Sequence, residues 1–182
     1  MQENRVILET SRLQLRELVP EDLDALVKVL SDPITMQYYP APYSRQQAAD
    51  WIERNRRRYQ EHGHSLWGMI LKSNGELIGD CGLAMQDVEG NNEIEIGYHV
   101  RRDLWKQGFA TEAASACRDY SFAKLKAERL ISLIRPENIP SRRVAEKNGM
   151  TIWKEVIWAN LPHLVYAIQR NTSNLNASPD QR

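Results

Sequence analysis

Cysteine, net charge and long apolar runs are all scarce in this sequence. It has two cysteines, Cys81 and Cys117, and its 24 basic residues balance 24 acidic ones. Two cysteines at this spacing form neither a metal motif nor a disulfide framework, so we expect buried free thiols and a reducing, cytoplasmic compartment. Neutral overall charge disfavours a nucleic-acid partner, since dedicated nucleic-acid binders are usually basic. The longest aliphatic run, near Leu130–Ile134, is too short to cross a bilayer, and the polar first residues lack the apolar stretch of a signal peptide, so no membrane partner is expected.

The overall composition is that of a soluble globular protein. Of the 182 residues, 42% are apolar and 26% are charged, which is ordinary for such proteins and enough to build a core. The length fits a single domain. We expect that domain to span residues 1–170. The polar residues 171–182, rich in Ser, Asn and Asp, predict a disordered C-terminal tail.

Hydrophobic periodicity predicts an α/β (α+β) domain with one mixed sheet. Ser44 and Gln47 form a capping box that opens a helix. Asn74-Gly75 is typical of a two-residue hairpin, in which both turn positions need a positive φ. Gly149 suits a left-handed helix cap. The predicted strands are 12–16, 65–72, 77–85, 93–100, 127–135, 150–158 and 163–168, and the predicted helices are 20–30, 44–63, 108–120 and 141–148.

The loop that precedes the third predicted helix has the composition of an anion site. The residues Gly108-Phe109-Ala110-Thr111 open the helix, where unpaired N–H groups and the helix dipole attract a phosphate. Gly108 has no Cβ, so a ligand could approach its backbone closely, and Lys106 with Arg101 or Arg102 adds positive charge. Neither a Walker motif nor G-x-G-x-x-G is present. The loop alone is equally compatible with an ordinary glycine-containing helix start.

Three ordered motifs resolve this ambiguity. The strand motif is Glu95–Val100 (E-I-G-Y-H-V), the loop motif is Trp105–Ala113 (W-K-Q-G-F-A-T-E-A), and the helix motif is Asn138–Met150 (N-I-P-S-R-R-V-A-E-K-N-G-M). Together they resemble the GNAT superfamily of acetyl-CoA-dependent N-acetyltransferases, and its RimJ/RimL-type branch in particular. The resemblance covers roughly residues 6–169. It implies a mostly antiparallel sheet flanked by helices, whose splayed central strands form the acetyl-CoA cleft.

The resemblance also implies where acetyl-CoA would bind. The pantetheine arm would bond main chain near His99 and Val100, the pyrophosphate would lie on the amides of residues 107–111, and a backbone N–H near Val100 would polarise the thioester carbonyl. No metal is implied. Trp105 departs from the superfamily's usual Gln or Arg, which removes one side-chain contact to phosphate. The implied cofactor-binding residues are His99, Val100, Arg102, Lys106, Gln107, Gly108, Phe109, Ala110, Thr111, Asn138 and Ser141.

The catalytic residues implied by the family are Glu95 and Ser141. Strand alternation places Glu95 and His99 on one face. Glu95 could accept the proton of the amine, anchor a cation or only form part of a solvated strand face, and His99 is a weaker candidate. A tyrosine that many relatives use to protonate the leaving thiolate is replaced by Ala145. Ser141 could bond the sulfur or only satisfy helix backbone, and Asn138 could be an N-cap as well as a cofactor contact.

The expected function is transfer of an acetyl group from acetyl-CoA to a primary amine, by direct attack in a ternary complex. The acceptor could be a protein N-terminal α-amine or a small-molecule amine. The alternative is a non-catalytic acyl-CoA-binding regulatory module. A homodimer is common in relatives. Arg54, Arg56, Arg57 and Arg58 predict a solvated or acceptor-side arginine face. His62 and His64 predict an exposed loop, and Trp153 and Trp158 are possible walls of the acceptor site.

Overall fold

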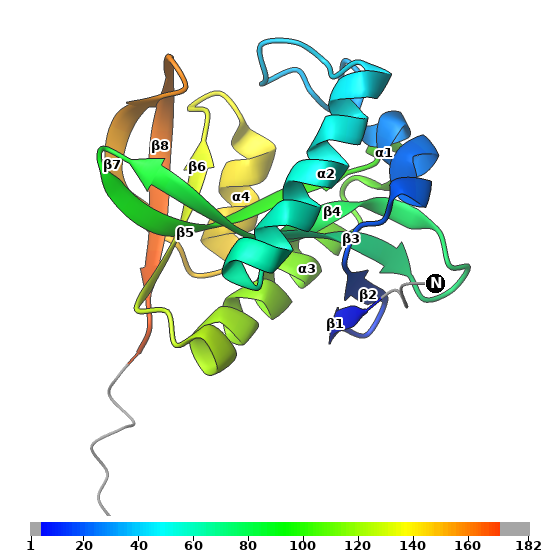
Figure 1. Ribbon diagram of the computed structural model, residues 1–182. Coiled ribbons are helices and arrows are strands. Elements are labelled where there is room, and N and C mark those ends of the chain that lie inside the picture. Colours follow the sequence, from blue (N-terminus) through cyan, green and yellow to red (C-terminus); the bar gives the residue numbers. More distant parts are fainter. Residues whose placement is uncertain (1–4, 172–182) are drawn as a thin grey trace, which may run out of the picture.

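The computed structural model describes residues 5–171. Within them, eight strands form one sheet that four α-helices flank (Figure 1). The strands are β1 Val6–Glu9, β2 Leu13–Arg16, β3 Leu66–Leu71, β4 Leu77–Val88, β5 Asn91–Val100, β6 Arg129–Ile134, β7 Thr151–Trp158 and β8 Leu161–Gln169. The helices are α1 Leu23–Leu30, α2 Arg45–His62, α3 Phe109–Tyr120 and α4 Ile139–Lys147. The predicted fold class is confirmed, although β1 was not foreseen.

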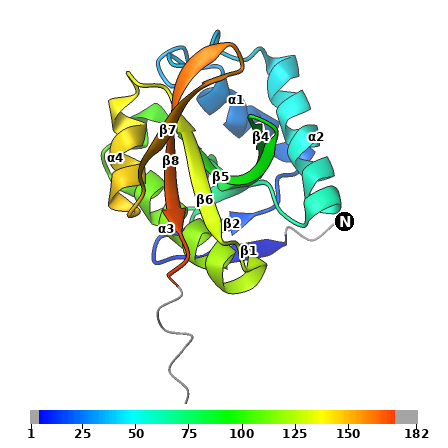
Figure 2. The ribbon, with the colours of Figure 1, turned by 90° about the vertical axis from the view of Figure 1, so that its left-hand side faces the viewer.

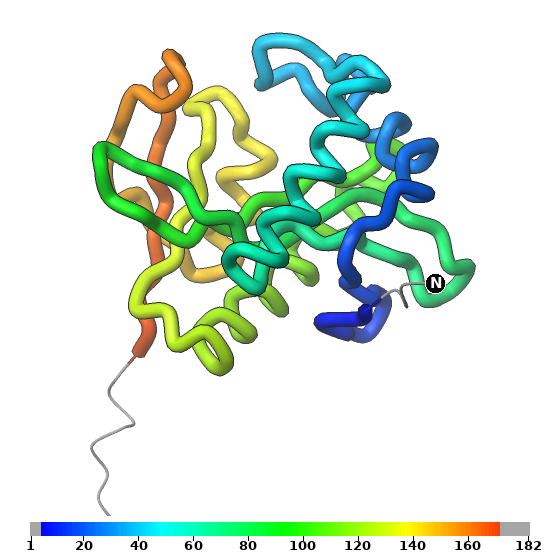
Figure 3. Tube along the Cα trace, in the orientation of Figure 1, coloured from blue at the N-terminus to red at the C-terminus, as the bar shows by residue number. Residues whose placement is uncertain are grey.

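The strand order in the sheet is β1-β2-β3-β4-β5-β6-β8-β7, and every neighbouring pair except β5–β6 is antiparallel. The N-terminal strands therefore lie at one end of the sheet and the C-terminal strands at the other, as the tube in Figure 3 shows from blue to red. The prediction of a single domain over residues 1–170 stays a prediction. The predicted tail, residues 171–182, lies outside the described residues except for Asn171.

Helices cover both faces of the sheet, α3 and α4 on one side and α1 and α2 on the other (Figure 2). The small buried face of α3, which includes Ala113, Ala114 and Cys117, packs into the main core with the apolar residues of the strands. Small side chains allow such close packing of helix on sheet. Cys81 and Cys117 are both buried and free, with sulfurs 3.7 Å apart, as predicted. None of the described helices has the length and apolar character that a membrane span requires.

The two predicted boundary signals of α2 and α4 are confirmed. Ser44 accepts a hydrogen bond from the Gln47 amide, and the Gln47 side chain accepts one from the Ser44 amide, at 3.2 and 2.8 Å. Gly149 has a φ of 81° after α4. These local interactions fix the ends of the helices independently of the core.

The hairpin predicted at Asn74-Gly75 is wrong in its geometry. Only Gly75 has a positive φ, and its N–H bonds Leu71 O at 2.8 Å, so the turn is longer than two residues. Two-residue turns with both φ values positive lie instead between β4 and β5, at Glu89 and Gly90 (54° and 80°), and between β7 and β8, at Ala159 and Asn160 (48° and 62°). Asn74 uses its side chain to accept the Glu76 amide at 3.0 Å, an Asx turn that competes with the hairpin type expected for Asn-Gly.

The two central parallel strands separate almost at once. Strands β5 and β6 pair only at Glu95 and Ile131, whereas β4 and β5 pair without a register break from Val88/Asn91 to Gly79/Val100. Beyond Glu95 the sheet is therefore split into a β1–β5 half and a β6–β8–β7 half. This confirms the splayed centre that the family resemblance implied and leaves backbone groups of both strands available to a ligand.

Candidate active site

A cavity of about 620 Å³ follows the split between β5 and β6. It is lined by both strands, by the loop before α3 and the first turn of that helix, by the start of α4, and by a segment between α1 and α2 that includes Tyr39. Glu95 also lines it. Of the predicted cofactor residues, those that line the cavity are His99, Val100, Lys106, Gly108, Phe109, Ala110, Thr111, Asn138 and Ser141.

Two predicted cofactor residues do not line the cavity. The side chain of Arg102 forms an ion pair with Asp32, at 3.4 Å between Nε and Oδ2. Gln107 turns its side chain toward the Asp103 carbonyl at 3.5 Å, and its own carbonyl accepts a hydrogen bond from Arg12 at 3.0 Å. The sequence could not show this, because loop residues next to a binding segment can point to either side of it.

The loop before α3 has the backbone geometry of an anion-binding nest. Lys106 and Gly108 have φ values of 62° and 86°, so left-handed residues flank Gln107 and turn the chain into the helix. Left-handed geometry costs a non-glycine residue such as Lys106 roughly 1–2 kcal/mol, and strain of this kind clusters at functional sites. The first amides of α3, at Phe109, Ala110 and Thr111, have no partner within the helix. They border the cavity, where they can receive a negative charge.

Arg12 and Glu112 brace this loop from outside the cavity. The Arg12 guanidinium lies 4.2 Å from the centre of the Phe109 ring and pairs with Glu112 at 2.6 Å. Glu112 also accepts hydrogen bonds from the Thr10 hydroxyl at 2.6 Å and from the Arg12 amide at 3.0 Å. The turn between β1 and β2 therefore holds the first turn of α3 in place.

The bracing interaction should make stability depend on pH. Burial alone would raise the pKa of Glu112, but the hydrogen bonds from Thr10 and Arg12 outweigh it and the pKa lies below its ordinary value. A carboxyl whose pKa is depressed in the folded state stabilises the fold at pH values above its unfolded-state pKa of about 4.3. That stabilisation is lost as the pH falls through the folded-state pKa. We expect Glu112→Gln to lower the free energy of unfolding at pH 7 by about 1–3 kcal/mol, and by less at pH 3.5. Urea denaturation measures both, with the exposed Glu155→Gln as the control; equal losses at both pH values would contradict the prediction.

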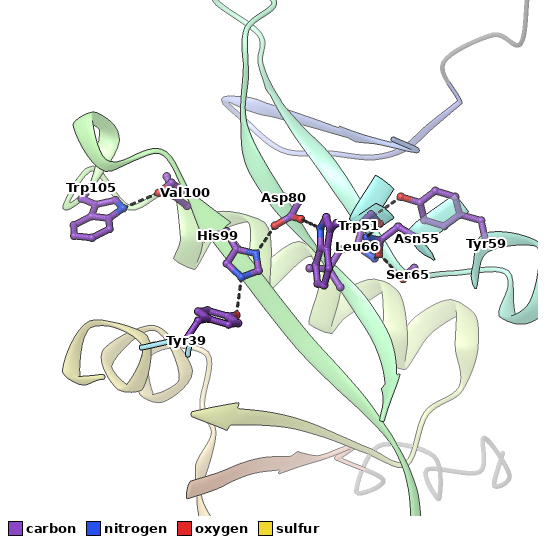
Figure 4. Close-up of polar contacts among 10 residues, drawn as sticks. All are labelled: Tyr39, Trp51, Asn55, Tyr59, Ser65, Leu66, Asp80, His99, Val100 and Trp105. Carbon is purple, nitrogen blue, oxygen red and sulfur yellow. Dashed lines mark hydrogen bonds and ion pairs between the residues drawn. The ribbon is translucent and has the colours of Figure 1, made fainter. Parts of the chain in front are cut away.

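The backbone at the end of β5 faces the split. The Arg101 amide bonds Ile78 O of β4 at 2.8 Å, so alternation directs the backbone groups of Tyr98 and Val100 to the opposite side, toward β6. The Val100 carbonyl accepts the indole N–H of Trp105 at 2.7 Å (Figure 4). Trp105 thus ties the loop before α3 to β5, and the Val100 N–H remains directed at the cavity.

Glu95 lies at the neck of the split, where the two strands part. Its carboxylate accepts hydrogen bonds from Gln86 Nε2 at 2.7 Å and from the Leu133 amide of β6 at 3.1 Å. Burial raises the pKa of Glu95 above its ordinary value, although these two hydrogen bonds act to lower it. The interpretation of Glu95 as a solvated strand face is therefore wrong. The residue lines the cavity, and the choice between base and cation anchor depends on what else the site contains.

His99 belongs to a connected set of polar side chains that the sequence did not reveal. Its Nδ1 lies 2.7 Å from Asp80 Oδ1, and its Nε2 lies 2.7 Å from the Tyr39 hydroxyl (Figure 4). The second oxygen of Asp80 accepts the indole N–H of Trp51 at 2.7 Å. Asp80 was detectable in principle, since it is a charged residue within the apolar strand L-I-G-D-C-G-L, but nothing in the sequence connects it to Tyr39.

Helix α2 is held against β3 by a polar anchor that positions Trp51. Asn55 accepts hydrogen bonds from the Ser65 hydroxyl at 2.7 Å and from the Leu66 amide at 3.1 Å (Figure 4). Trp51 lies one helical turn before Asn55, and Asn55 is buried. The anchor therefore fixes the indole that binds Asp80.

The start of α4 forms the opposite wall of the cavity. Asn138 is the helix N-cap, since its side chain accepts the Ser141 amide at 3.2 Å. The Ser141 carbonyl accepts the hydroxyl of Tyr98 at 2.9 Å. Ala145, which replaces the tyrosine that many relatives use to protonate the leaving thiolate, is buried in the core. Burial also raises the pKa of Tyr98, which keeps this phenol protonated beside the split.

Three other features take no part in the cavity. His64 is buried with its Nδ1 2.7 Å from Leu83 O, so the expectation that His62 and His64 are exposed is wrong for His64. Trp153 lies 45% exposed beneath Arg129, and Trp158 donates to Asp87 O, so neither borders the cavity. The described residues contain no group of three potential metal ligands.

Comparison with known proteins identifies the family to which this chain belongs. A family model described as an acetyltransferase (GNAT) domain matches residues 12–151. The uncharacterized protein YkkB of Bacillus subtilis (strain 168) is 39% identical over 160 residues, which cover 87% of this chain and 93% of YkkB. The uncharacterized N-acetyltransferase p20 of Bacillus licheniformis is 37% identical over 150 residues, or 81% of this chain and 83% of p20.

A solved structure agrees with these sequence matches. The acetyltransferase from Agrobacterium tumefaciens str. C58 superposes with a TM-score of 0.76 at 27% identity, covering 93% of this chain and 100% of its own. The chain belongs to the GNAT family of acetyltransferases, which confirms the resemblance carried by its three motifs. The protein is therefore an enzyme that transfers acyl groups.

Proposed function

We propose that the enzyme transfers an acetyl group from acetyl-CoA to a primary amine. The observation that carries this proposal is the continuous cavity along the β5–β6 split, with unpaired α3 amides at one part of its wall and Glu95 and His99 at another. A donor with a pyrophosphate and a long neutral arm would fit the part lined by the α3 amides. An amine, which is cationic before reaction, would fit the part lined by Glu95 and His99.

The donor would be bound largely by main chain. The pyrophosphate oxygens would accept hydrogen bonds from the backbone N–H groups of Phe109 to Thr111, with the Lys106 ammonium nearby. The pantetheine arm would lie beside the backbone groups of Tyr98 and Val100 that face the split. The Val100 N–H would then hold the developing oxyanion of the thioester. A preorganised donor of this kind is worth on the order of 3 kcal/mol in the transition state.

The acceptor would enter from the α1–α2 side of the sheet. Glu95 and His99 share that face of β5, where Tyr39 and Trp51 also lie. Direct attack needs no enzyme nucleophile, and neither buried cysteine lines the cavity. Both a protein N-terminal α-amine and a small-molecule amine satisfy these requirements. The amine must lose a proton before it attacks, because ammonium groups have pKa values of about 8 to 10.4.

A panel assay tests the proposal. Thiol release from acetyl-CoA is measured with N-terminal peptides, polyamines, amino acids and aminoglycosides, while calorimetry measures acetyl-CoA binding. Release that depends on one class of amine supports the proposal and assigns the acceptor chemistry. Tight acetyl-CoA binding without release for any amine would instead favour a non-catalytic acyl-CoA-binding module.

Glu95→Gln should impair use of the amine without weakening acetyl-CoA binding. The substitution keeps the shape that accepts the Leu133 amide but removes the negative charge from the cavity. We expect kcat/KM for the amine to fall about 10-fold or more, since pairing with a charged group contributes about 1.5–3 kcal/mol. Steady-state kinetics separates the roles: a fall in kcat alone indicates a base, and a rise in the amine KM alone indicates a cation anchor. The exposed Glu128→Gln is the matched control, and unchanged kinetics in Glu95→Gln would exclude both roles.

A further inference from the structure

Asp80 is a buried carboxylate whose two oxygens each have one defined partner. The residue is fully buried in β4, and it faces His99 Nδ1 with one oxygen and the Trp51 indole N–H with the other. An isolated carboxylate in such a position would be costly, so its partners determine its state. Because the indole can only donate, one Asp80 oxygen is an obligatory acceptor.

This arrangement selects one tautomer of His99. When Asp80 is ionised, it accepts a hydrogen bond from Nδ1–H and leaves Nε2 of the neutral ring as an acceptor. Nε2 is the atom that meets the Tyr39 hydroxyl. The His99 side chain is only 9% exposed, and Trp51 stacks edge-on at 5.8 Å, so the ring has little freedom to rotate away from Asp80.

Tyr39 connects this pair to the cavity. The residue as a whole is 42% exposed, and its hydroxyl lies 2.7 Å from His99 Nε2. Burial of the hydroxyl and the nearby carboxylate of Glu95 raise the pKa of Tyr39. The phenol therefore stays protonated. A neutral hydroxyl that donates to His99 has lone pairs left to accept a proton from a group inside the cavity.

We propose that Tyr39, His99 and Asp80 form a proton relay that deprotonates the acceptor ammonium. The inference rests on the proposed function and specifies how the same site activates its amine. Tyr39 and His99 are the catalytic residues, because both line the cavity. Asp80 is a positioning residue that acts through His99, in the way that a buried carboxylate orients a catalytic imidazole elsewhere.

The relay moves one proton before attack. The Tyr39 oxygen takes a proton from the ammonium as the Tyr39 hydroxyl proton passes to His99 Nε2, which leaves a neutral amine and an imidazolium paired with Asp80. The amine nitrogen then bonds to the thioester carbonyl carbon, the C–S bond breaks, and its electron pair goes to sulfur. The second nitrogen proton ends on the CoA thiolate, and the imidazolium returns its proton to solvent.

Glu95 is less suited to this role. Both of its oxygens already accept N–H donors, from Gln86 and from the Leu133 amide that the parting strands leave unpaired. It is better placed to hold the ammonium near Tyr39 by charge. The titratable and charged groups that face His99 or act on it through a neighbour are Asp80 from β4, Tyr39 and Tyr43 from the segment before α2, Glu95 from β5, and Arg54 and Arg58 from α2.

The test compares the wild-type enzyme with His99→Ala, Tyr39→Phe and Asp80→Asn, using the amine found active in the panel. General-base catalysis contributes about 100-fold or more, so we expect kcat for His99→Ala to fall at least about 100-fold with unchanged acetyl-CoA affinity. Added imidazole should restore part of this activity. Tyr39→Phe should lower kcat although its ring remains, and Asp80→Asn should shift the acid limb of the kcat/KM pH profile.

Two controls distinguish the relay from a structural role. Tyr43→Phe alters a tyrosine of the same aromatic cluster, whose ring centre lies 6.4 Å from that of Tyr39, and should leave kcat unchanged. NMR of isotope-labelled histidine should show an Nδ1–H signal for His99 that Asp80→Asn removes. Active His99→Ala and Tyr39→Phe variants in an active wild-type background would overturn the relay alone. A wild type that binds acetyl-CoA but acetylates no amine would overturn the proposed function and the relay with it.

Discussion

Replacing Gly79 with alanine should lower the free energy of unfolding by about 3 kcal/mol, the upper range for overpacking a well-packed site. A Cβ at Gly79 would lie 2.0 Å from the His99 carbonyl oxygen and 2.9 Å from its carbonyl carbon. Both are backbone atoms of a paired strand, so no side chain can move aside to relieve the overlap. The pairing of Gly79 with Val100 would have to break.

The control for this prediction is Gly97→Ala in the neighbouring strand. A Cβ there would meet only the Leu66 side chain, at 3.5 Å, which is ordinary contact. Urea denaturation should show a large loss for Gly79→Ala and a change of about 0.5 kcal/mol or less for Gly97→Ala. The Nδ1–H signal of His99 should be lost in Gly79→Ala, since the displaced backbone carries the imidazole. Equal stability of the two variants would contradict the close approach of β5 to β4 at Gly79.

Much of the fold could be predicted because its signals are local. The Ser44 capping box and the Gly149 cap are satisfied within a few residues, so they survive any tertiary context. The hairpin at Asn74 failed for the opposite reason, because the Asn74 side chain could satisfy a different turn from the one that Asn-Gly favours. The position of β8 between β6 and β7 is a tertiary outcome that periodicity does not encode.

The candidate site likewise has one part that local sequence predicts and one part that only the tertiary structure reveals. The anion-binding nest before α3 was predictable, since the N-terminus of the helix and its glycine are contiguous in sequence. The motif Trp105–Ala113 identified its residues. The relay brings together Tyr39, Asp80 and His99 from three separate segments, and only the register of β4 with β5 places Asp80 beside His99. The sequence therefore suggested only a minor role for His99, because its proposed function depends on contacts with Asp80 and Tyr39 that its own position in the sequence does not reveal.

Replacing Gly108 with valine should weaken acetyl-CoA binding about 100-fold. Gly108 has a φ of 86° and is the N-cap of α3. A Cβ there would lie 3.5 Å from the Arg12 guanidinium, so a branched side chain would press on the residue that braces this loop and displace the amides proposed to bind the pyrophosphate. Losing two hydrogen bonds to a charged group costs about 3 kcal/mol, which corresponds to that factor in Kd. Calorimetry with acetyl-CoA measures the change directly and does not require the acceptor.

Gly90→Val separates this effect from backbone strain. Gly90 has nearly the same φ, 80°, and a Cβ there would meet nothing within 4 Å, so both substitutions carry a similar conformational cost in the left-handed region. Both variants should lose a comparable amount of stability, but only Gly108→Val should lose affinity. Equal Kd values for the two variants would mean that the α3 amides do not bind the donor, and the pyrophosphate would then have to lie elsewhere along the split, beside the backbone of Tyr98 and Val100.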